Sequence, residues 1–139
     1  MEARLKNLKN VLPAILLAVA VACTGLTARQ KSLLPAMKLA WPGVSTDVKN
    51  GIQASLDAHR IDGPTAAAQT ADTDHLGAAV DAGDPIAMSG IAWKPLADAA
   101  AFGVDARVAK GEISTGVAGS LKERVKNFGD SLAVFLERR

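Results

Sequence analysis

The side chains best suited to chemistry in this 139-residue sequence lie in the run Asp72-Thr73-Asp74-His75. Carboxylates and an imidazole are metal ligands, and His59 could add a third ligand from a neighbouring helix. On a helix, residues three apart share a face and residues two apart do not, so only Asp72 and His75 can converge. Because a tetrahedral site needs three or four converging ligands, the sequence predicts no metal and no other cofactor.

Other catalytic motifs are missing from the sequence, which contains no GxSxG, HExxH or phosphate-loop pattern. A hydrolase would need a positioned acid, but Glu112 and Glu123 fall in an expected turn and on an expected polar helix face. We therefore predict a non-enzymatic protein. The alternative is an envelope hydrolase or metal-binding protein that uses Asp72, Asp74 and His75.

The only cysteine, Cys23, directly follows an apolar run over residues 11–22 that ends in small side chains. A short leader with Arg4, Lys6 and Lys9 precedes this run. The order of a basic segment, an apolar segment and small residues is typical of a secretory signal peptide. With a single cysteine, the chain cannot form an intramolecular disulfide in an oxidising compartment.

The residues Ala20-Val21-Ala22-Cys23 resemble the lipobox of bacterial lipoproteins. The resemblance covers residues 1–23 only, and those signals usually carry leucine where this sequence has Ala20. It implies that a signal peptide, residues 1–22, is removed and that Cys23 is lipidated and becomes the mature N-terminus. Thr24 in place of aspartate after the cysteine further implies onward export, which favours the periplasmic side of the outer membrane over the inner membrane.

Two other interpretations of this segment stay open. The uncharged span over residues 10–28 is 19 residues long. A membrane-spanning helix needs about 20 residues, so the segment can instead be an uncleaved single-pass anchor. Cys23 can also be an ordinary buried thiol. With either a signal or an anchor, the positive leader stays inside and the body is exported, so we expect a protein of the bacterial cell envelope.

Charge outside the leader excludes one class of partner. The leader holds three cations and one acid, and subtracting them from 16 basic and 14 acidic residues leaves 13 of each. Nucleic-acid binding needs Lys and Arg clustered on one face, so we expect the membrane and another protein as partners, and no nucleic acid. Residues 40–91 hold two cations and seven aspartates, a net of −5, which predicts an acidic surface.

Residues 23–39 are expected to be the lipidated cysteine and a tether, ahead of a helical domain over residues 40–139. The tether carries Arg29, Lys31 and Lys38 without any acid, so it can lie near anionic lipid headgroups. Its apolar residues can equally pack on the domain, as a helical turn that breaks near Pro35.

The domain is predicted to contain an internal repeat. Shifting the sequence by 52 residues aligns tryptophan, glycine and apolar positions, as a duplicated unit would. The aligned pairs include Trp41 and Trp93, Gly51 and Gly103, Ile61 and Ile113, Leu76 and Phe128, and Gly77 and Gly129. We therefore interpret residues 40–83 and 92–135 as two copies of one unit.

In the first unit, an apolar residue every four positions from Val44 to Leu56 predicts a helix over about residues 46–59. Asp62 followed by Pro64 predicts the start of a second helix, over about residues 65–82. This second helix is rich in alanine and poor in large apolar residues, so we expect it to be the weakest element.

In the second unit, Pro95 marks a helix start and Gly111 a helix end, and Ser114 caps a final amphipathic helix. Each hairpin alone would leave an apolar stripe in water, so pairing the hairpins buries both stripes. The sequence therefore predicts an all-α fold, a small four-helix bundle built from two repeated αα-hairpins.

Four apolar residues form the candidate partner surface. Trp41 and Trp93 lie just ahead of each unit's first helix, where they either pack over the end of the bundle or present two exposed rings to a glycan or lipid. Ile86 and Met88 lie between the units and should be buried in a monomer; if exposed, they indicate a partner site. The sequence thus predicts a lipid-anchored envelope protein, of bacterial or prophage origin, that presents a helical bundle to another protein.

Overall fold

The computed structural model describes residues 25–137, and this part of the chain folds into helices without any strand. Helices α2 (Ala28–Asp57) and α3 (Gly63–Ala82) form one hairpin, and α5 (Trp93–Ala109) and α6 (Thr115–Phe135) form another. The short helix α4 (Pro85–Ser89) lies in the connection between the hairpins. The predicted all-α class is therefore confirmed for the described residues.

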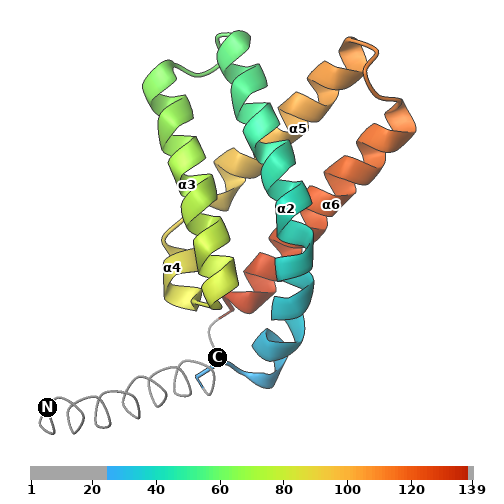
Figure 1. Cartoon of the computed structure of the whole chain (residues 1–139). Coiled ribbons are helices and arrows are strands. Elements are labelled where there is room, and N and C mark those ends of the chain that lie inside the picture. The colour runs from blue at the N-terminus through green and yellow to red at the C-terminus, as the bar shows by residue number, and fades with distance from the viewer. Residues whose placement is uncertain (1–24, 138–139) are drawn as a thin grey trace, which may run out of the picture.

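Helix α2 is the central element of the fold. Its largest interface is with α5, and it also packs against α3 and α6 (Figure 1). The first turn of α2 is tied to the end of α6, because the Gln30 amide donates a 2.7 Å hydrogen bond to the carbonyl oxygen of Phe135. Arg29 adds an ion pair with Glu137 at 3.2 Å. The two ends of the described chain therefore lie together, while the hairpin loops lie at the opposite end of the molecule (Figure 1).

The first helix begins much earlier than the sequence predicted, at Ala28 instead of about residue 46. Thr27 caps it, because the Thr27 hydroxyl accepts the Gln30 N–H and the Gln30 side chain accepts the Thr27 N–H. This reciprocal arrangement satisfies two backbone donors that a helix start leaves free. The stretch expected to be a tether is therefore mostly the first third of α2, and the expected domain boundary at residue 40 falls inside this helix.

Two prolines inside α2 explain why the sequence pointed to a break. Pro35 and Pro42 lack the N–H that would bond the carbonyl four residues earlier. Both are exposed, so the free carbonyls lie on the outer side of the helix, where water can bond them. On the inner side, Met37 is buried in the core. Packing on the domain thus offsets the two missing bonds, and the expected break near Pro35 does not occur.

The predicted caps of α3 and α6, the second helix of each hairpin, are confirmed. The Asp62 carboxylate accepts the Thr65 N–H at 2.8 Å at the start of α3, where Pro64 lies in the first turn. The Ser114 hydroxyl accepts the Val117 N–H at 3.2 Å at the start of α6. Hydrogen bonds from Thr65 lower the pKa of Asp62 below its usual 3.8, because they favour the ionised carboxylate.

The two hairpin loops have the same local geometry. His59 in the first and Gly111 in the second have positive φ angles, of 57° and 73°. Just after them, the N–H of Arg60 bonds the Ser55 carbonyl and the N–H of Glu112 bonds the Arg107 carbonyl, each at 2.9 Å. Glycine adopts this left-handed conformation without strain, whereas a histidine there is uncommon.

Helices α2 and α5 touch through their backbones at two glycines. A Cβ added at Gly51 would collide with the Ala99 carbonyl group, and a Cβ added at Gly103 would lie 2.5 Å from the Gly51 Cα. Real Cβ atoms essentially never come that close, so any side chain at these positions would push the helices apart. The crossing of the two hairpins therefore depends on Gly51 and Gly103.

The core runs between the hairpins and around this crossing. Its largest fully buried side chains come from all five helices, namely Met37, Val44, Val48, Thr73, Leu76, Val80, Met88, Leu96 and Phe135. Thr73 is the polar member of this set, and its hydroxyl donates to the Gln69 carbonyl oxygen at 2.7 Å. The core therefore leaves no charged group among its most buried side chains.

Candidate functional site

The residues proposed as metal ligands do not come together. His59 lies in the α2–α3 loop, whereas His75 is exposed on α3, about 18 Å along the helix axis from Gly63 at 1.5 Å per residue. Asp74 pairs instead with Lys49 of α2 at 2.7 Å. Across residues 25–137, no three histidine, cysteine or acidic side chains are grouped as metal ligands.

Of the four residues proposed as a partner surface, two belong to the core. Trp41 is only 9% exposed and Met88 is fully buried, so the structure corrects their assignment to the surface. Burial of Met88 was the expectation for a monomer, and α4 achieves it by turning this side chain toward the hairpins. Ile86, on the other side of α4, is 84% exposed, and Trp93 is half-buried. Ile86 and Trp93 therefore remain as candidate surface residues.

The two tryptophans occupy similar positions on either side of Phe128. The ring centroids of Trp41 and Trp93 each lie 5.2 Å from that of Phe128, in tilted arrangements. The indole of Trp41 lies against Gly77 and that of Trp93 against Gly129, where a Cβ would collide with the indole nitrogen. These glycines let each indole come close to the second helix of its own hairpin, so the rings act mainly as packing groups.

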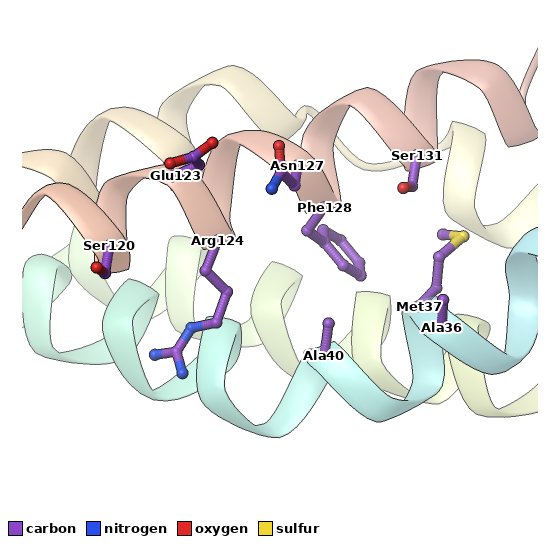
Figure 2. Close-up of a pocket in the computed structure, with 9 residues that line it drawn as sticks. All are labelled: Ala36, Met37, Ala40, Ser120, Glu123, Arg124, Asn127, Phe128 and Ser131. Atoms are coloured by element: carbon purple, nitrogen blue, oxygen red, sulfur yellow. The ribbon is translucent and has the colours of Figure 1, made fainter.

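A groove of about 460 Å³ lies between α2 and α6. Figure 2 shows Met37 and Ala40 of α2 facing Phe128 of α6, and these three side chains form its apolar floor. Asn127 and Glu123 lie at its outer rim in the same view. An apolar floor with a polar rim is the usual composition of a ligand or partner groove.

Arg124 closes one end of this groove. Its guanidinium reaches from α6 to α2, where one nitrogen lies 2.6 Å from the Asp47 carboxylate and 3.3 Å from the Gly43 carbonyl oxygen. The Asp47 side chain is only 4% exposed, so the arginine compensates a nearly buried charge. Gly43 provides the space, because a Cβ there would lie 2.6 Å from Arg124 Nη1. No sequence motif indicates this pair, whose members are 77 residues apart.

A second groove, of about 390 Å³, lies between α5 and α6 and has mostly apolar walls. Trp93, Ala101 and Val125 line it, and Lys122 and Lys126 lie along its edge. Lys49 and Asp74 form an ion pair between α2 and α3. At the 52-residue offset, these two residues correspond to Ala101 and Lys126 of the second hairpin. The second hairpin has no pair at those two positions. Its helices are joined instead by the Lys122–Asp105 ion pair, and Lys126 pairs with Asp130 of its own helix.

The residues of the expected lipidation signal, Ala20, Val21, Ala22 and Cys23, lie outside the described residues. Within residues 25–137, none of the helices combines the length and the apolar character needed to cross a bilayer. Comparison of the chain with protein-family models, with curated proteins and with solved structures finds no match.

Proposed function

We propose that the chain is a non-enzymatic, lipid-anchored protein of the bacterial cell envelope that holds its helical domain at a membrane surface for binding another protein. The observation that carries this proposal is the short separation of the lipobox-like signal from the fold. Only residues 24–27 lie between Cys23 and the start of α2 at Ala28. A lipid on Cys23 would therefore hold the helical domain directly against the bilayer.

The arrangement of the chain ends supports the same orientation. Arg29 and Gln30 join the start of α2 to the end of α6, so both ends of the described chain lie next to the proposed anchor. Arg29 and Lys31 at this end would meet anionic headgroups. The hairpin loops lie at the other end of the molecule, away from the anchored end of the chain (Figure 1).

For the protein partner, we favour the groove between α5 and α6. It contains Trp93, the half-buried member of the tryptophan pair, and its walls are mostly apolar. An amphipathic helix with small apolar contact residues would fit such a groove. Ala101 is the position to test, because it lines the groove and a large side chain there would fill it.

The anchor is tested by labelling cells with radioactive palmitate. We expect the wild-type protein to incorporate the label, and Cys23→Ser to abolish incorporation and leave the precursor uncleaved. Cys23→Ser that still carries the label would contradict lipidation at this residue. Membrane fractionation of the same cells tests the location, and we expect the labelled protein in the outer membrane if the host has one.

We further propose that the two hairpins are copies of one unit, arranged as a four-helix bundle with approximate twofold symmetry. The helix ends support this, since Asp57 and Gly63 differ by 52 residues from Ala109 and Thr115. The caps at Asp62 and Ser114 differ by the same 52 residues. So do the left-handed residues His59 and Gly111, and the Trp–Gly contacts in the two hairpins.

Exchange of the loops tests the duplication. Replacing residues 58–62, Ala-His-Arg-Ile-Asp, by the sequence of residues 110–114, Lys-Gly-Glu-Ile-Ser, should preserve the helical circular dichroism signal and the cooperative unfolding transition. Both loops have the same length and the same φ pattern, so the exchanged residues should adopt the local geometry of the originals. A variant that lost its cooperative transition would contradict the equivalence of the two units.

A further inference from the structure

The first half of α2 has an outer face that nothing in the described chain covers. This face consists of Lys31, Pro35, Lys38, Leu39 and Pro42, which are all exposed. At 3.6 residues per turn, they fall within about 100° of the helix circumference, opposite the buried face. Leu39 lies at one edge of this set, directly after Lys38 in the sequence. It is 85% exposed and is the most exposed large apolar side chain between residues 25 and 137.

The charge of this face is positive and is not compensated by neighbours. Between Glu2 and Asp47 the sequence contains no acidic residue. Asp47 itself is nearly buried and bound by Arg124, so it does not reach the outer face. Lys31 and Lys38 take part in none of the ion pairs of the described chain. An exposed leucine beside two lysines, on a helix side with no acid, is complementary to an anionic lipid surface.

The position of this outer face along the chain, close to the proposed anchor, indicates that the bilayer covers it. The outer face begins three residues into α2, and α2 begins five residues after Cys23, the proposed lipidation site. At 1.5 Å per residue, Leu39 lies about 16 Å along the axis from Ala28. If α2 stood upright on the membrane, Lys38 and Leu39 would lie beyond the Debye length of about 8 Å at physiological salt, where headgroup charge is screened. Contact with both lysines requires the helix to lie along the surface.

We propose that the outer face of α2, formed by Lys31, Pro35, Lys38, Leu39 and Pro42, lies flat on the anionic bilayer to which Cys23 is anchored. Leu39 enters the headgroup region and the two lysines contact lipid phosphates. The proposal rests on the proposed lipid anchor and adds a fixed orientation to it. In that orientation the α5–α6 groove, on the other hairpin, stays free for a partner.

Lysine acetylation tests the orientation. The protein is purified from membranes, reconstituted into vesicles of phosphatidylcholine with or without phosphatidylglycerol, treated with an amine-reactive acetylating reagent, and digested for mass spectrometry. In anionic vesicles we expect Lys31 and Lys38 to react about fivefold more slowly than in neutral vesicles, the factor expected for one lysine at an anionic surface. Lys110, which is exposed at the loop of the other hairpin, serves as the internal control and should react equally in both.

Two matched variants separate the leucine from the lysines. Leu39→Ser keeps both lysines but removes the apolar contact, so it should restore most of the reactivity of Lys38 in anionic vesicles. Val117→Ser is the control, since Val117 is 47% exposed in the first turn of α6, by the hairpin loop and away from the anchored end of the chain. It should leave the protection of Lys38 unchanged. Both positions are exposed, so neither change removes a core contact.

Flotation of the vesicles distinguishes the two proposals. If the wild-type protein floats with the vesicles and Lys38 is protected, both hold. If it floats and Lys38 reacts as fast as Lys110 in anionic vesicles, the orientation is overturned and the anchor stands; a protein partner would then be the occupant of the outer face. If the wild-type protein does not float, the anchor fails and the orientation fails with it.

Discussion

The α2–α3 and α5–α6 hairpins have the same loop geometry and the same tryptophan-on-glycine contact, but their cores and surfaces differ. In the first hairpin Leu76 occupies the central core position, and in the second Phe128 does, where it contacts both tryptophans. The outer surface of the first is closed by the Lys49–Asp74 ion pair. The second has its interhelical ion pair, Lys122–Asp105, at other positions and leaves a groove beside it. The difference is consistent with our proposals that the first hairpin contacts the membrane and that the second binds a partner.

The longer first helix increases this asymmetry. Helix α2 extends from Trp41 back to Ala28, whereas α5 begins at Trp93, the position equivalent to Trp41. The extension lets α2 pack against α6, and it forms the α2–α6 groove. Contacts between α3 and α5 are few by comparison. Most of the packing between the two hairpins is therefore made by α2, and little of it by α3.

The largest predicted difference between the hairpins is in their core. Phe128→Ala should lower the free energy of unfolding by about 3 to 5 kcal/mol, because it removes a buried ring that contacts Trp41 and Trp93. Leu76→Ala should cost less, about 2 to 3 kcal/mol, because leucine is smaller and the alanine-rich α3 can close around the gap. Urea unfolding followed by circular dichroism measures both. Equal losses would show that Leu76 and Phe128 contribute equally to the free energy of unfolding.

The next largest effect concerns the glycines at the crossing of the hairpins. Gly51→Ala and Gly103→Ala should each destabilise the protein by about 1 to 3 kcal/mol, because the added Cβ meets backbone that cannot move aside. Gly119→Ala is the matched control, since it lies inside α6 with nothing within 4 Å of the added Cβ. It should stabilise the protein by up to about 1 kcal/mol through helix propensity. A neutral Gly103→Ala would mean that α2 and α5 can separate at little cost.

Local sequence signals predicted much of the fold. Asp62, Pro64 and Ser114 fixed the starts of α3 and α6 to within about two residues, because a cap and a first-turn proline act within a few residues. The start of α2 could not be predicted in this way. Pro35 and Pro42 disfavour a helix locally, and only the burial of side chains such as Met37 offsets them, which depends on residues far away in the sequence.

The candidate site was harder to predict than the fold. The Asp47–Arg124 pair joins residues on different hairpins, and neither lies in a recognisable motif. Trp41 was assigned both to packing and to a partner surface, and only its position over Gly77 decides for packing. Leu39 looked like part of a tether, so its exposure on a regular helix could not be foreseen. Sites of this kind require the relative placement of helices, which sequence periodicity does not provide.

A charge substitution tests whether the second hairpin can form an ion pair at the positions where the first hairpin has Lys49 and Asp74. Ala101→Glu would place a carboxylate opposite Lys126, at the positions where the first hairpin has Lys49 and Asp74. We expect a gain of about 0.2 to 1 kcal/mol in the free energy of unfolding, the usual range for an exposed pair. Ala101→Gln is the control, because it adds a side chain of the same shape without the charge and should gain nothing from Lys126. If both variants behave alike, position 101 does not face Lys126 as Lys49 faces Asp74.

The smallest expected difference is in the pH dependence of the two helix caps. Folding lowers the pKa of Asp62 below its usual 3.8, because the ionised carboxylate accepts hydrogen bonds from Thr65. The stability from this cap is therefore complete above the usual pKa and is lost as the pH falls through the lower pKa of the folded state. Ser114, the corresponding cap of α6, does not ionise at any of these pH values.

Lowering the pH from 5 to 2 should therefore speed the amide exchange of Thr65 relative to that of Val117, after correction for the intrinsic pH dependence, as followed by nuclear magnetic resonance. Asp62→Ser copies the cap of the second hairpin and should make the corrected Thr65-to-Val117 ratio independent of pH. Asp62→Ala should raise Thr65 exchange at every pH, because no side chain then accepts its N–H. If the corrected wild-type ratio does not change with pH, the ionised Asp62 carboxylate stabilises the first hairpin no more than the Ser114 hydroxyl stabilises the second.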